Sequence, residues 1–354
     1  MEKNKKKILF FLPSSVGGAE RITITIAKFL DTEQFEVKFV IVSRRLGDII
    51  KFIPKNYGII HLSIKNIWCF PILRIYKILR KEKPNSVFCS LRYLSSRLII
   101  AARLHKKINI IVRCENGLSN LRLDHKLLMR YTYPHANCII AQQEEMRQEL
   151  IQKMKLNKNK IITLQNPIDI QTIEEKIKVE SPYKIDDTSV KYVWVGRFAK
   201  AKGQDVLVKA FEIVHKHNPN VSLYLIGKYN WDCSYDKSIK DFIIEHKLSH
   251  CIHCIGFDEN PYRWVKHCDC FVLPSRLEGL PNALIEALYL HIPVVATKCI
   301  PVISRIVNEG KNGYMVPTED FNAMAEAMTK AIKIDKKTIN YTSTPKEYFI
   351  SLFK

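Results

Sequence analysis

The sequence predicts an α/β protein made of two consecutive domains, each a doubly wound parallel sheet. Short apolar strands alternate with amphipathic helices twice along the 354 residues, and a glycine turn follows the first strand. A polar stretch with little regular pattern separates the two series, and the length suffices for two domains of ordinary size. We therefore place an N-terminal domain at 1–165, a connection at 166–189 and a C-terminal domain at 190–354.

The first series opens with a βαβ unit. A strand over 7–12 leads through Gly17 and Gly18 into a helix over 20–30, and a second strand follows at 35–42. The alternation then continues. Strands are predicted at 86–90, 108–112, 138–141 and 161–164, and helices at 72–81, at 95–104 and from the end of the 138–141 strand to about 153.

The second series has the same pattern. Its strands are predicted at 190–195, 221–226, 251–255, 270–273 and 293–296, with helices between them, for example over 204–217 and 282–290. Such domains bind ligands at the carboxyl ends of their strands. The tail from about 341 carries Tyr348, Phe349 and Phe353, and we expect it to dock back on the N-terminal domain.

The positive charge is concentrated in the first half of the chain. Of a net charge of +21, residues 1–165 carry +19, from 31 Lys and Arg against 12 Asp and Glu. Such a field attracts an anionic membrane, a nucleic acid or a phosphorylated substrate, although a solvated basic surface has the same composition. No RNA-binding, zinc-finger or helix-turn-helix signature is evident, so a nucleic acid partner is not expected.

The sequence predicts a cytoplasmic protein that can bind the inner face of the plasma membrane. Apolar runs such as 8–13 are far shorter than the roughly 20 residues of a membrane span, and no signal-peptide cleavage site follows the lysine-rich start. Residues 67–71 and the cations around 72–81 can form an interfacial patch; alternatively, the apolar stripe packs on the sheet. The cations are Lys65, Arg74, Lys77, Arg80, Lys81 and Lys83.

The ten cysteines are expected to be reduced and buried. The segments 251–254 and 267–270 together have the composition of a zinc site. However, both read as parts of buried strands, where cysteine behaves as a small hydrophobe, and no metal site is expected.

The segment 274–288 carries the strongest chemical signal. It follows a predicted strand and opens a helix near Asn282, so Gly279 and the free N–H groups there can approach a diphosphate. Glu278 lies on the loop, and Glu286 lies one turn into the helix. A capped, exposed helix would also explain Glu278, but not a carboxylate inside an otherwise apolar run.

This segment, with seven residues between the two glutamates, resembles the signature of the retaining GT-B glycosyltransferases of family 4 (glycosyl transferase group 1). The resemblance implies the GT-B fold, two Rossmann-like domains facing across a cleft. It further implies that Glu278 lies beside the donor sugar and that Glu286 binds the ribose of a nucleotide-sugar. Gly279, Leu280 and Asn282 then belong to the donor-binding loop.

Three other segments agree with this resemblance in order and spacing. Arg197 and Lys202 follow the first strand of the second domain and correspond to the family's diphosphate ligands, although basic residues on a surface loop are the alternative. Gly256 and Phe257 resemble the turn beside the nucleobase, although Phe257 could equally belong to the core. Gly17 and Gly18 resemble the glycine loop that faces the phosphates and the acceptor.

The acceptor side departs from the family. Many relatives place a histidine after the strand that here ends at Val112, whereas this chain has Arg113, Glu115 and Asn116, which become the candidate acceptor contacts.

The resemblance implies a retaining transfer of a hexose or N-acetylhexosamine from a nucleotide-sugar, UDP-linked by family habit, to a saccharide or lipid-diphosphate-linked acceptor in polysaccharide or glycan synthesis. Neither a cofactor nor a metal is expected, because no Asp-x-Asp triplet is present. The alternatives are a GT-B nucleotide-sugar epimerase and a non-catalytic nucleotide-sugar-binding protein.

Overall fold

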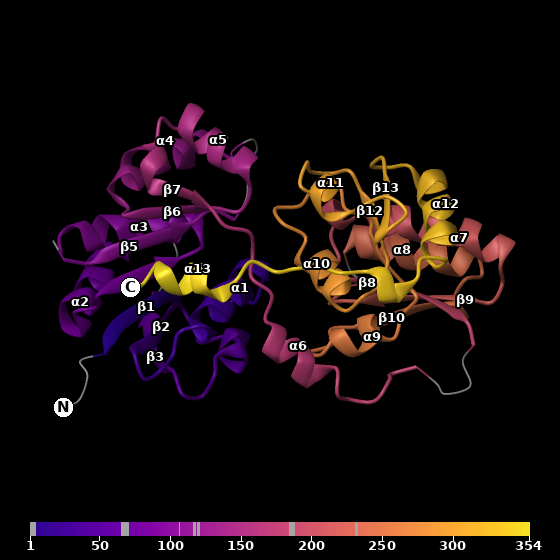
Figure 1. Cartoon of the computed structure of the whole chain (residues 1–354), viewed down its shortest axis with the longest axis horizontal. Helices are drawn as coiled ribbons and strands as arrows, with labels where there is room; N and C mark the ends of the chain where they lie inside the picture. The colour runs from indigo at the N-terminus through magenta and orange to yellow at the C-terminus, as the bar shows by residue number, and fades with distance from the viewer. Residues whose placement is uncertain are drawn as a thin grey trace. The chain divides into compact units, whose positions relative to one another are not determined.

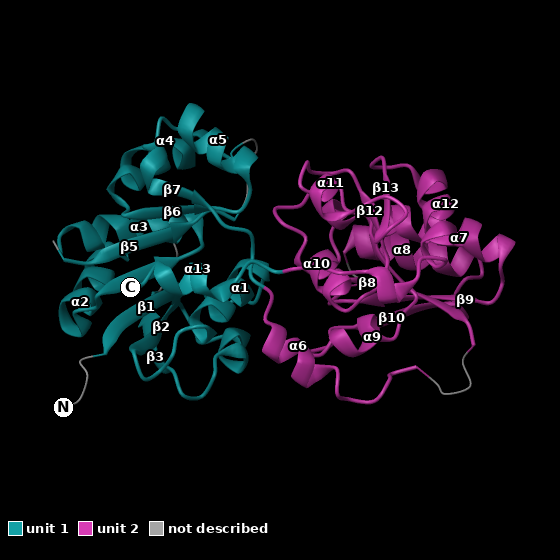
Figure 2. Ribbon diagram, in the orientation of Figure 1, with its two compact units in different colours: residues 1–167, 343–354 teal, residues 168–342 magenta. Residues whose placement is uncertain are grey.

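The computed structural model describes residues 5–64, 71–105, 107–115, 118, 121–183, 188–230 and 233–354. The chain forms two compact units, which Figure 2 colours separately. The first contains residues 1–167 and 343–354, and the second contains residues 168–342. The segment 166–189 is therefore not a simple connection, because helix α6 (Ile170–Lys176) and the buried Tyr183 lie in the second unit.

The first unit is built on a seven-stranded parallel sheet in the order β3-β2-β1-β4-β5-β6-β7. Strands such as β1 are almost continuously apolar because helices cover both faces of the sheet. The strands are β1 (Lys6–Leu12), β2 (Phe35–Ser43), β3 (Gly58–Ser63), β4 (Ser86–Cys89), β5 (Asn109–Arg113), β6 (Cys138–Ala141) and β7 (Ile161–Thr163).

The helices of the first unit flank this sheet (Figure 1). They are α1 (Gly18–Lys28), α2 (Ile72–Glu82), α3 (Arg92–Arg103), α4 (Leu123–Thr132), α5 (Glu144–Gln152) and α13 (Lys346–Ser351), with 3-10 turns at Asp48–Phe52, Tyr133–His135 and Lys158–Lys160. The C-terminal tail contributes α13 to this unit. The ring of Phe353 lies 5.6 Å from that of Phe10, and Phe349 lies 6.0 Å from Phe29.

The second unit has a six-stranded parallel sheet in the order β10-β9-β8-β11-β12-β13. Its strands are β8 (Val190–Val195), β9 (Val221–Ile226), β10 (Ile252–Gly256), β11 (Cys270–Leu273), β12 (Val294–Thr297) and β13 (Gly313–Val316). Besides α6, its helices are α7 (Gln204–His217), α8 (Ser234–Glu245), α9 (Tyr262–Lys266), α10 (Asn282–Tyr289), α11 (Ile303–Ile306) and α12 (Phe321–Ala331), with 3-10 turns at Lys200–Lys202 and Lys336–Thr338. Within the described parts of the chain, every helix is too short or too polar to cross a bilayer.

Candidate active site

The strand order places a switch point in the middle of the second sheet. From β8 the chain proceeds outward through β9 to β10, and from β11 it proceeds outward on the other side through β12 to β13. The loops that follow β8 and β11 therefore leave neighbouring strands and turn to opposite sides, which opens a crevice at the carboxyl edge. The candidate donor residues Arg197, Lys202, Glu278 and Gly279 lie on these two loops.

The backbones of the two loops are bonded to each other. The N–H groups of Arg276 and Leu277 donate to the carbonyl of Ala201, at 2.8 and 3.2 Å. Gly203, with φ of +69°, lies so close to the second loop that a Cβ there would meet the carbonyl oxygen of Pro274 at 2.0 Å. A glycine is required at this position both by its conformation and by this close approach.

Side chains reinforce this connection. The Arg276 guanidinium donates to both carboxylate oxygens of Asp205, each at 2.8 Å, and also contacts Glu319 and the carbonyl of Lys200. Burial alone would raise the pKa of Asp205, but hydrogen bonds from Arg276 and Tyr235 hold that pKa below its ordinary value. The carboxylate therefore remains ionised and joins the start of α7 to the loop that carries Arg276.

Lys202 and Glu278 meet where the two loops converge. The Lys202 ammonium lies 2.7 and 2.8 Å from the two oxygens of Glu278, and the Ser275 hydroxyl donates to one of these oxygens at 2.6 Å. The Glu278 side chain is only 6% exposed, whereas that of Lys202 is 29% exposed. A buried carboxylate thus has two donors, and a cation remains accessible beside it.

Glu286 lies one turn into α10, half-buried, and accepts a hydrogen bond of 3.4 Å from the Tyr262 hydroxyl of α9. This partner explains how a carboxylate is tolerated in an apolar helix. Asn282 begins α10, while the side chain of Leu280 is buried in the core, so that only its backbone can reach a ligand.

Arg197, Gly256 and Phe257 lie at the same carboxyl edge. The Arg197 side chain is exposed, and in the described part of the chain it forms no ion pair. Gly256 ends β10 with φ of +83°. Phe257 is 60% exposed, which excludes the alternative that its ring belongs to the core.

The first sheet has its own switch point, between β1 and β4. Gly17 caps α1, and the carboxylate of Glu20 in the first turn is folded back onto this loop. A Cβ on Gly17 would meet Oε2 of Glu20 at 2.7 Å. The loop after β4 is joined to α1 by a hydrogen bond of 2.7 Å between the hydroxyls of Ser90 and Thr23. Gly17, Gly18 and Glu20 thus lie at the carboxyl edge of the first sheet, beside the β1–β4 switch point.

Two carboxyl groups lie near each other at this edge. Burial raises the pKa of Glu20, which is 7% exposed. Burial also raises the pKa of Glu115, and the charge of Glu20 raises it further, although Arg113 and Arg92 oppose the shift. Glu115 is only half-buried, so it is the more accessible residue of the pair.

The expectation that Arg113 contacts an acceptor is wrong, because its side chain is buried. Its side chain is 1% exposed, and its guanidinium donates to the amide oxygen of Asn166, so it offers no surface to a ligand. Asn116, the third candidate, lies outside the described residues.

The segments 251–254 and 267–270, which together have the composition of a zinc site, are far apart in the fold. Strands β10 and β11 are separated by β9 and β8 in the sheet. The thiols of Cys268 and Cys270 are buried, and that of Cys268 donates to the carbonyl of Val265. These segments therefore do not combine into one site.

Sequence reasoning missed three contributors to these edges. Glu20 belongs to the glycine-loop segment already singled out, but nothing in the sequence indicated that its carboxylate turns back onto Gly17. The Asp205–Arg276 pair joins residues far apart in the chain and leaves no local pattern. Ser275 could have been found from its place directly before the glutamate loop.

Comparison with known proteins agrees with this architecture. Residues 175–346 match the family described as Glycosyl transferases group 1, and residues 16–172 match Glycosyltransferase Family 4. An uncharacterized glycosyltransferase of Methanocaldococcus jannaschii is 30% identical over 253 residues, which cover 66% of this chain and 61% of that protein.

A second relative matches almost the full length. It is the N-acetylgalactosamine-N,N'-diacetylbacillosaminyl-diphospho-undecaprenol 4-alpha-N-acetylgalactosaminyltransferase of Campylobacter jejuni, 24% identical with 96% of this chain and 93% of the relative covered. Among solved structures, Anabaena HepE in complex with UDP and glucose has a TM-score of 0.75 at 18% identity, with coverage of 94% and 92%. This last likeness shows the fold.

Proposed function

We propose that this chain, which is a glycosyltransferase with the GT-B fold, moves a hexose or N-acetylhexosamine from a UDP-sugar to a saccharide or lipid-linked saccharide, with retention of configuration. The product would enter a polysaccharide or glycan. The observation that carries this proposal is the Lys202–Glu278 pair at the switch point of the second sheet.

On the donor side, the diphosphate binds at the start of α10 and between the two loops. Arg197 and Lys202 supply positive charge where the leaving diphosphate gains negative charge. Lys202 is suited to this role because it is held by Glu278 yet remains partly exposed. Glu286 accepts hydrogen bonds from the ribose hydroxyls, for which the Tyr262 hydroxyl holds it in place.

On the acceptor side, the hydroxyl that attacks is bound by Glu115. The C1–oxygen bond to the diphosphate breaks, the acceptor oxygen bonds C1 on the same face, and the hydroxyl proton passes to the departing diphosphate. The chain supplies electrostatic stabilisation of this oxocarbenium-like transition state, and no metal or other cofactor is needed. Glu20 acts as a positioning residue, because it is too buried to touch the acceptor.

Two similar proteins support the choice of substrates. The Campylobacter relative acts on a sugar carried by diphospho-undecaprenol, and HepE was solved with UDP and glucose. The first is consistent with an anionic, lipid-linked acceptor for a first domain whose net charge is +19 in residues 1–165, and the second is consistent with a uridine donor.

A lipid-linked acceptor requires contact with a membrane, and we assign this contact to α4. Leu123, Leu127 and Tyr131 are spaced four residues apart, so they form one stripe along the helix, and they are 72%, 47% and 72% exposed. The two leucines line a hollow of about 470 Å³ together with Leu118, Lys126, Arg130, Lys153 and Met154. Exposed apolar groups with a basic rim suit an anionic bilayer surface.

The patch around α2 is less suited to this role. Ile75 and Leu79 are buried, and Ile72, Tyr76 and Ile78 pack against the same core, which supports the alternative that this apolar stripe covers the sheet. Residues 65–70, which completed the expected patch, lie outside the described residues.

The decisive test is incubation of the purified chain with radiolabelled UDP- and GDP-sugars, with and without a diphospho-lipid saccharide. We expect acceptor-dependent transfer from a UDP-sugar, abolished in a Lys202→Ala, Glu286→Ala double variant. Conversion of the donor without an acceptor would instead indicate an epimerase. Binding that raises the melting temperature without turnover would indicate a non-catalytic protein.

A further inference from the structure

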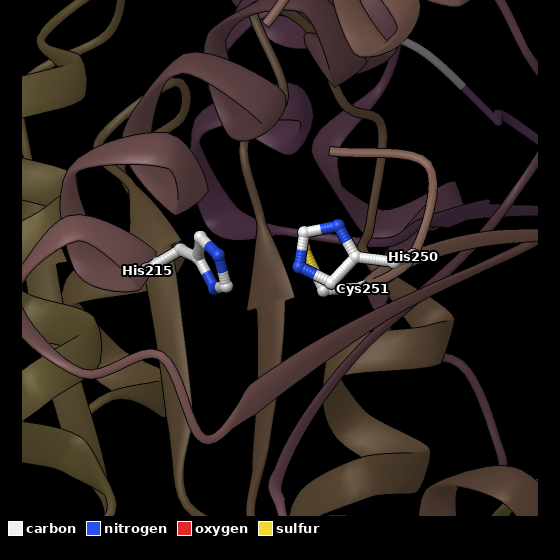
Figure 3. A group of neighbouring side chains, drawn as sticks. All are labelled: His215, His250 and Cys251. Carbon is white, nitrogen blue, oxygen red and sulfur yellow. The ribbon is translucent and has the colours of Figure 1, made fainter. Parts of the chain in front are cut away.

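Three side chains of types that bind metals lie together in the second unit, at the edge opposite the donor loops. His215 lies near the end of α7, and His250 and Cys251 directly precede β10 (Figure 3). One donor atom from each lies within 4.8 Å of the others. Because α7 leads away from the carboxyl edge, its end and the start of β10 share the amino-terminal edge of the sheet.

One ring nitrogen of this cluster is buried without a hydrogen bond to any described residue. Nδ1 of His215 is buried and has no hydrogen-bond partner in the described part of the chain. Cys251 is 3% exposed, while His250 is exposed and directs its Nδ1 to the carbonyl of Lys247 at 3.1 Å. A buried, unpaired ring nitrogen is uncommon in proteins and is explained when an ion or water completes its bonding.

We propose that His215, His250 and Cys251 form a zinc-binding site whose fourth ligand is a water molecule on the exposed side of His250. Imidazole and thiolate are the ligands that Zn²⁺ prefers, in tetrahedral geometry with bonds of about 2.0 to 2.3 Å. Ligand atoms in that geometry lie about 3.5 Å apart, so side-chain rotation must draw the three together by about 1 Å.

Binding exchanges one set of bonds for another without oxidation or reduction. The Cys251 thiol now donates to the carbonyl of Leu248 at 3.4 Å. On binding, the Sγ–H bond breaks, its proton passes to solvent, and an Sγ–Zn bond forms.

The site stabilises the second unit and does not take part in transfer. It connects α7 to β10 across 35 residues of sequence, on the edge opposite Lys202 and Glu278. The inference therefore stands independently of the proposed reaction.

Aromatic packing is the competing explanation for the cluster. The His215 ring stacks on Phe211, with centroids 6.2 Å apart, and meets His250 edge-on at 5.2 Å. Packing requires neither the thiol nor a metal, so a probe that reports on the sulfur separates the two explanations.

The test titrates Co²⁺ into the chelator-treated full-length chain. We expect one equivalent to give the visible bands of tetrahedral cobalt and a near-ultraviolet thiolate charge-transfer band, both removed by Zn²⁺. His250 is exposed, so His250→Asn should preserve the fold. Loss of a residue that only supports a metal ligand lowers metal affinity roughly 10- to 100-fold, and loss of His250 itself should lower the affinity at least as much. Cys251→Ser should remove the charge-transfer band.

Two variants serve as matched controls. Cys233→Ser removes an exposed thiol, and His217→Asn removes an exposed imidazole two residues along α7. Both should keep the bands and the rise in melting temperature that Zn²⁺ gives the wild type. The proposal is overturned if no charge-transfer band forms, if the band survives in Cys251→Ser, or if Zn²⁺ stabilises His250→Asn as much as the wild type.

Discussion

The Lys202 ammonium lies 2.7 and 2.8 Å from the two carboxylate oxygens of Glu278, although the residues are 76 positions apart in the sequence. Each is placed by a loop that leaves one of two neighbouring strands, β8 and β11. Under the proposed function the pair serves both the stability of the second unit and the donor chemistry, and variants of each member separate the two effects.

Lys202→Ala should lower kcat and also destabilise the second unit. Removing the ammonium leaves a carboxylate that is 6% exposed and retains the Ser275 hydroxyl as a donor, which should cost about 1–3 kcal/mol in urea unfolding. Adding Glu278→Gln should restore part of this stability but not the activity. If Glu278→Gln lowered the free energy of unfolding by the same amount in Lys202→Ala as in the wild type, the two residues would not be coupled.

Glu286→Ala should raise the KM for the nucleotide-sugar with a smaller effect on kcat. Losing a charge-assisted hydrogen bond costs about 1.5–3 kcal/mol of binding free energy, which weakens the affinity for the donor roughly 10- to 100-fold. Tyr262→Phe is the matched variant, because it removes only the hydroxyl that holds the carboxylate, and we expect a smaller increase. Steady-state kinetics with the donor varied measures both, and an unchanged donor KM in Glu286→Ala would reject the ribose contact.

Glu115→Gln should change the pH dependence of acceptor use. Because burial and Glu20 raise the pKa of Glu115, the acidic limb of kcat/KM for the acceptor should lie at higher pH than for an ordinary glutamate. The variant should lose this limb and raise the acceptor KM, while the donor KM stays unchanged. An identical acidic limb in the variant would assign it to another group.

The same shift has a consequence for stability. A carboxyl group whose pKa is higher in the folded than in the unfolded state favours folding while it is protonated, and this contribution is lost as pH rises through the folded-state pKa. As pH increases through this range, the wild type should therefore lose free energy of unfolding relative to Glu115→Gln. Urea unfolding at several pH values measures it.

Gly203→Ala should destabilise the protein more than Gly310→Ala. Both glycines have nearly equal positive φ, +69° and +71°, so both variants carry the left-handed cost of roughly 1–2 kcal/mol. The added methyl group meets the Pro274 carbonyl at 2.0 Å in the first case, but only the Tyr314 hydroxyl at 3.8 Å in the second. Gly203→Ala should also lower transfer activity, because it pushes apart the loops that carry Lys202 and Glu278; equal melting temperatures would contradict this.

Replacing Leu123 and Leu127 by serine should weaken binding to vesicles that contain anionic lipid. Both leucines are exposed on α4, so the fold should be preserved, and transfer to a water-soluble acceptor should be unchanged. Leu73→Ser on α2 is the control, because Leu73, at 73%, is as exposed as Leu123 but lies on the patch that we consider less suited. Flotation at physiological salt measures binding, and equal loss in the control would argue against α4.

The sequence alone determined the parallel-sheet architecture and singled out the candidate donor residues. Buried parallel strands are continuous apolar runs, so 190–195 and 270–273 were predicted at the bounds observed. Strands β3 and β13 were not predicted, because neither is a continuous buried run: in β3 only Leu62 is buried, and in β13 only the two end residues are buried. Glu278 and Glu286 were identified because their spacing and their apolar surroundings are local properties of the chain.

Only the tertiary structure decided which of these residues meet. That Arg113 is buried, that Glu20 turns back onto Gly17, and that Lys202 binds Glu278 depend on the order of strands in each sheet. The physical reason is that the hydrophobic pattern fixes local elements, whereas contacts between loops far apart in sequence arise where parallel strands end side by side.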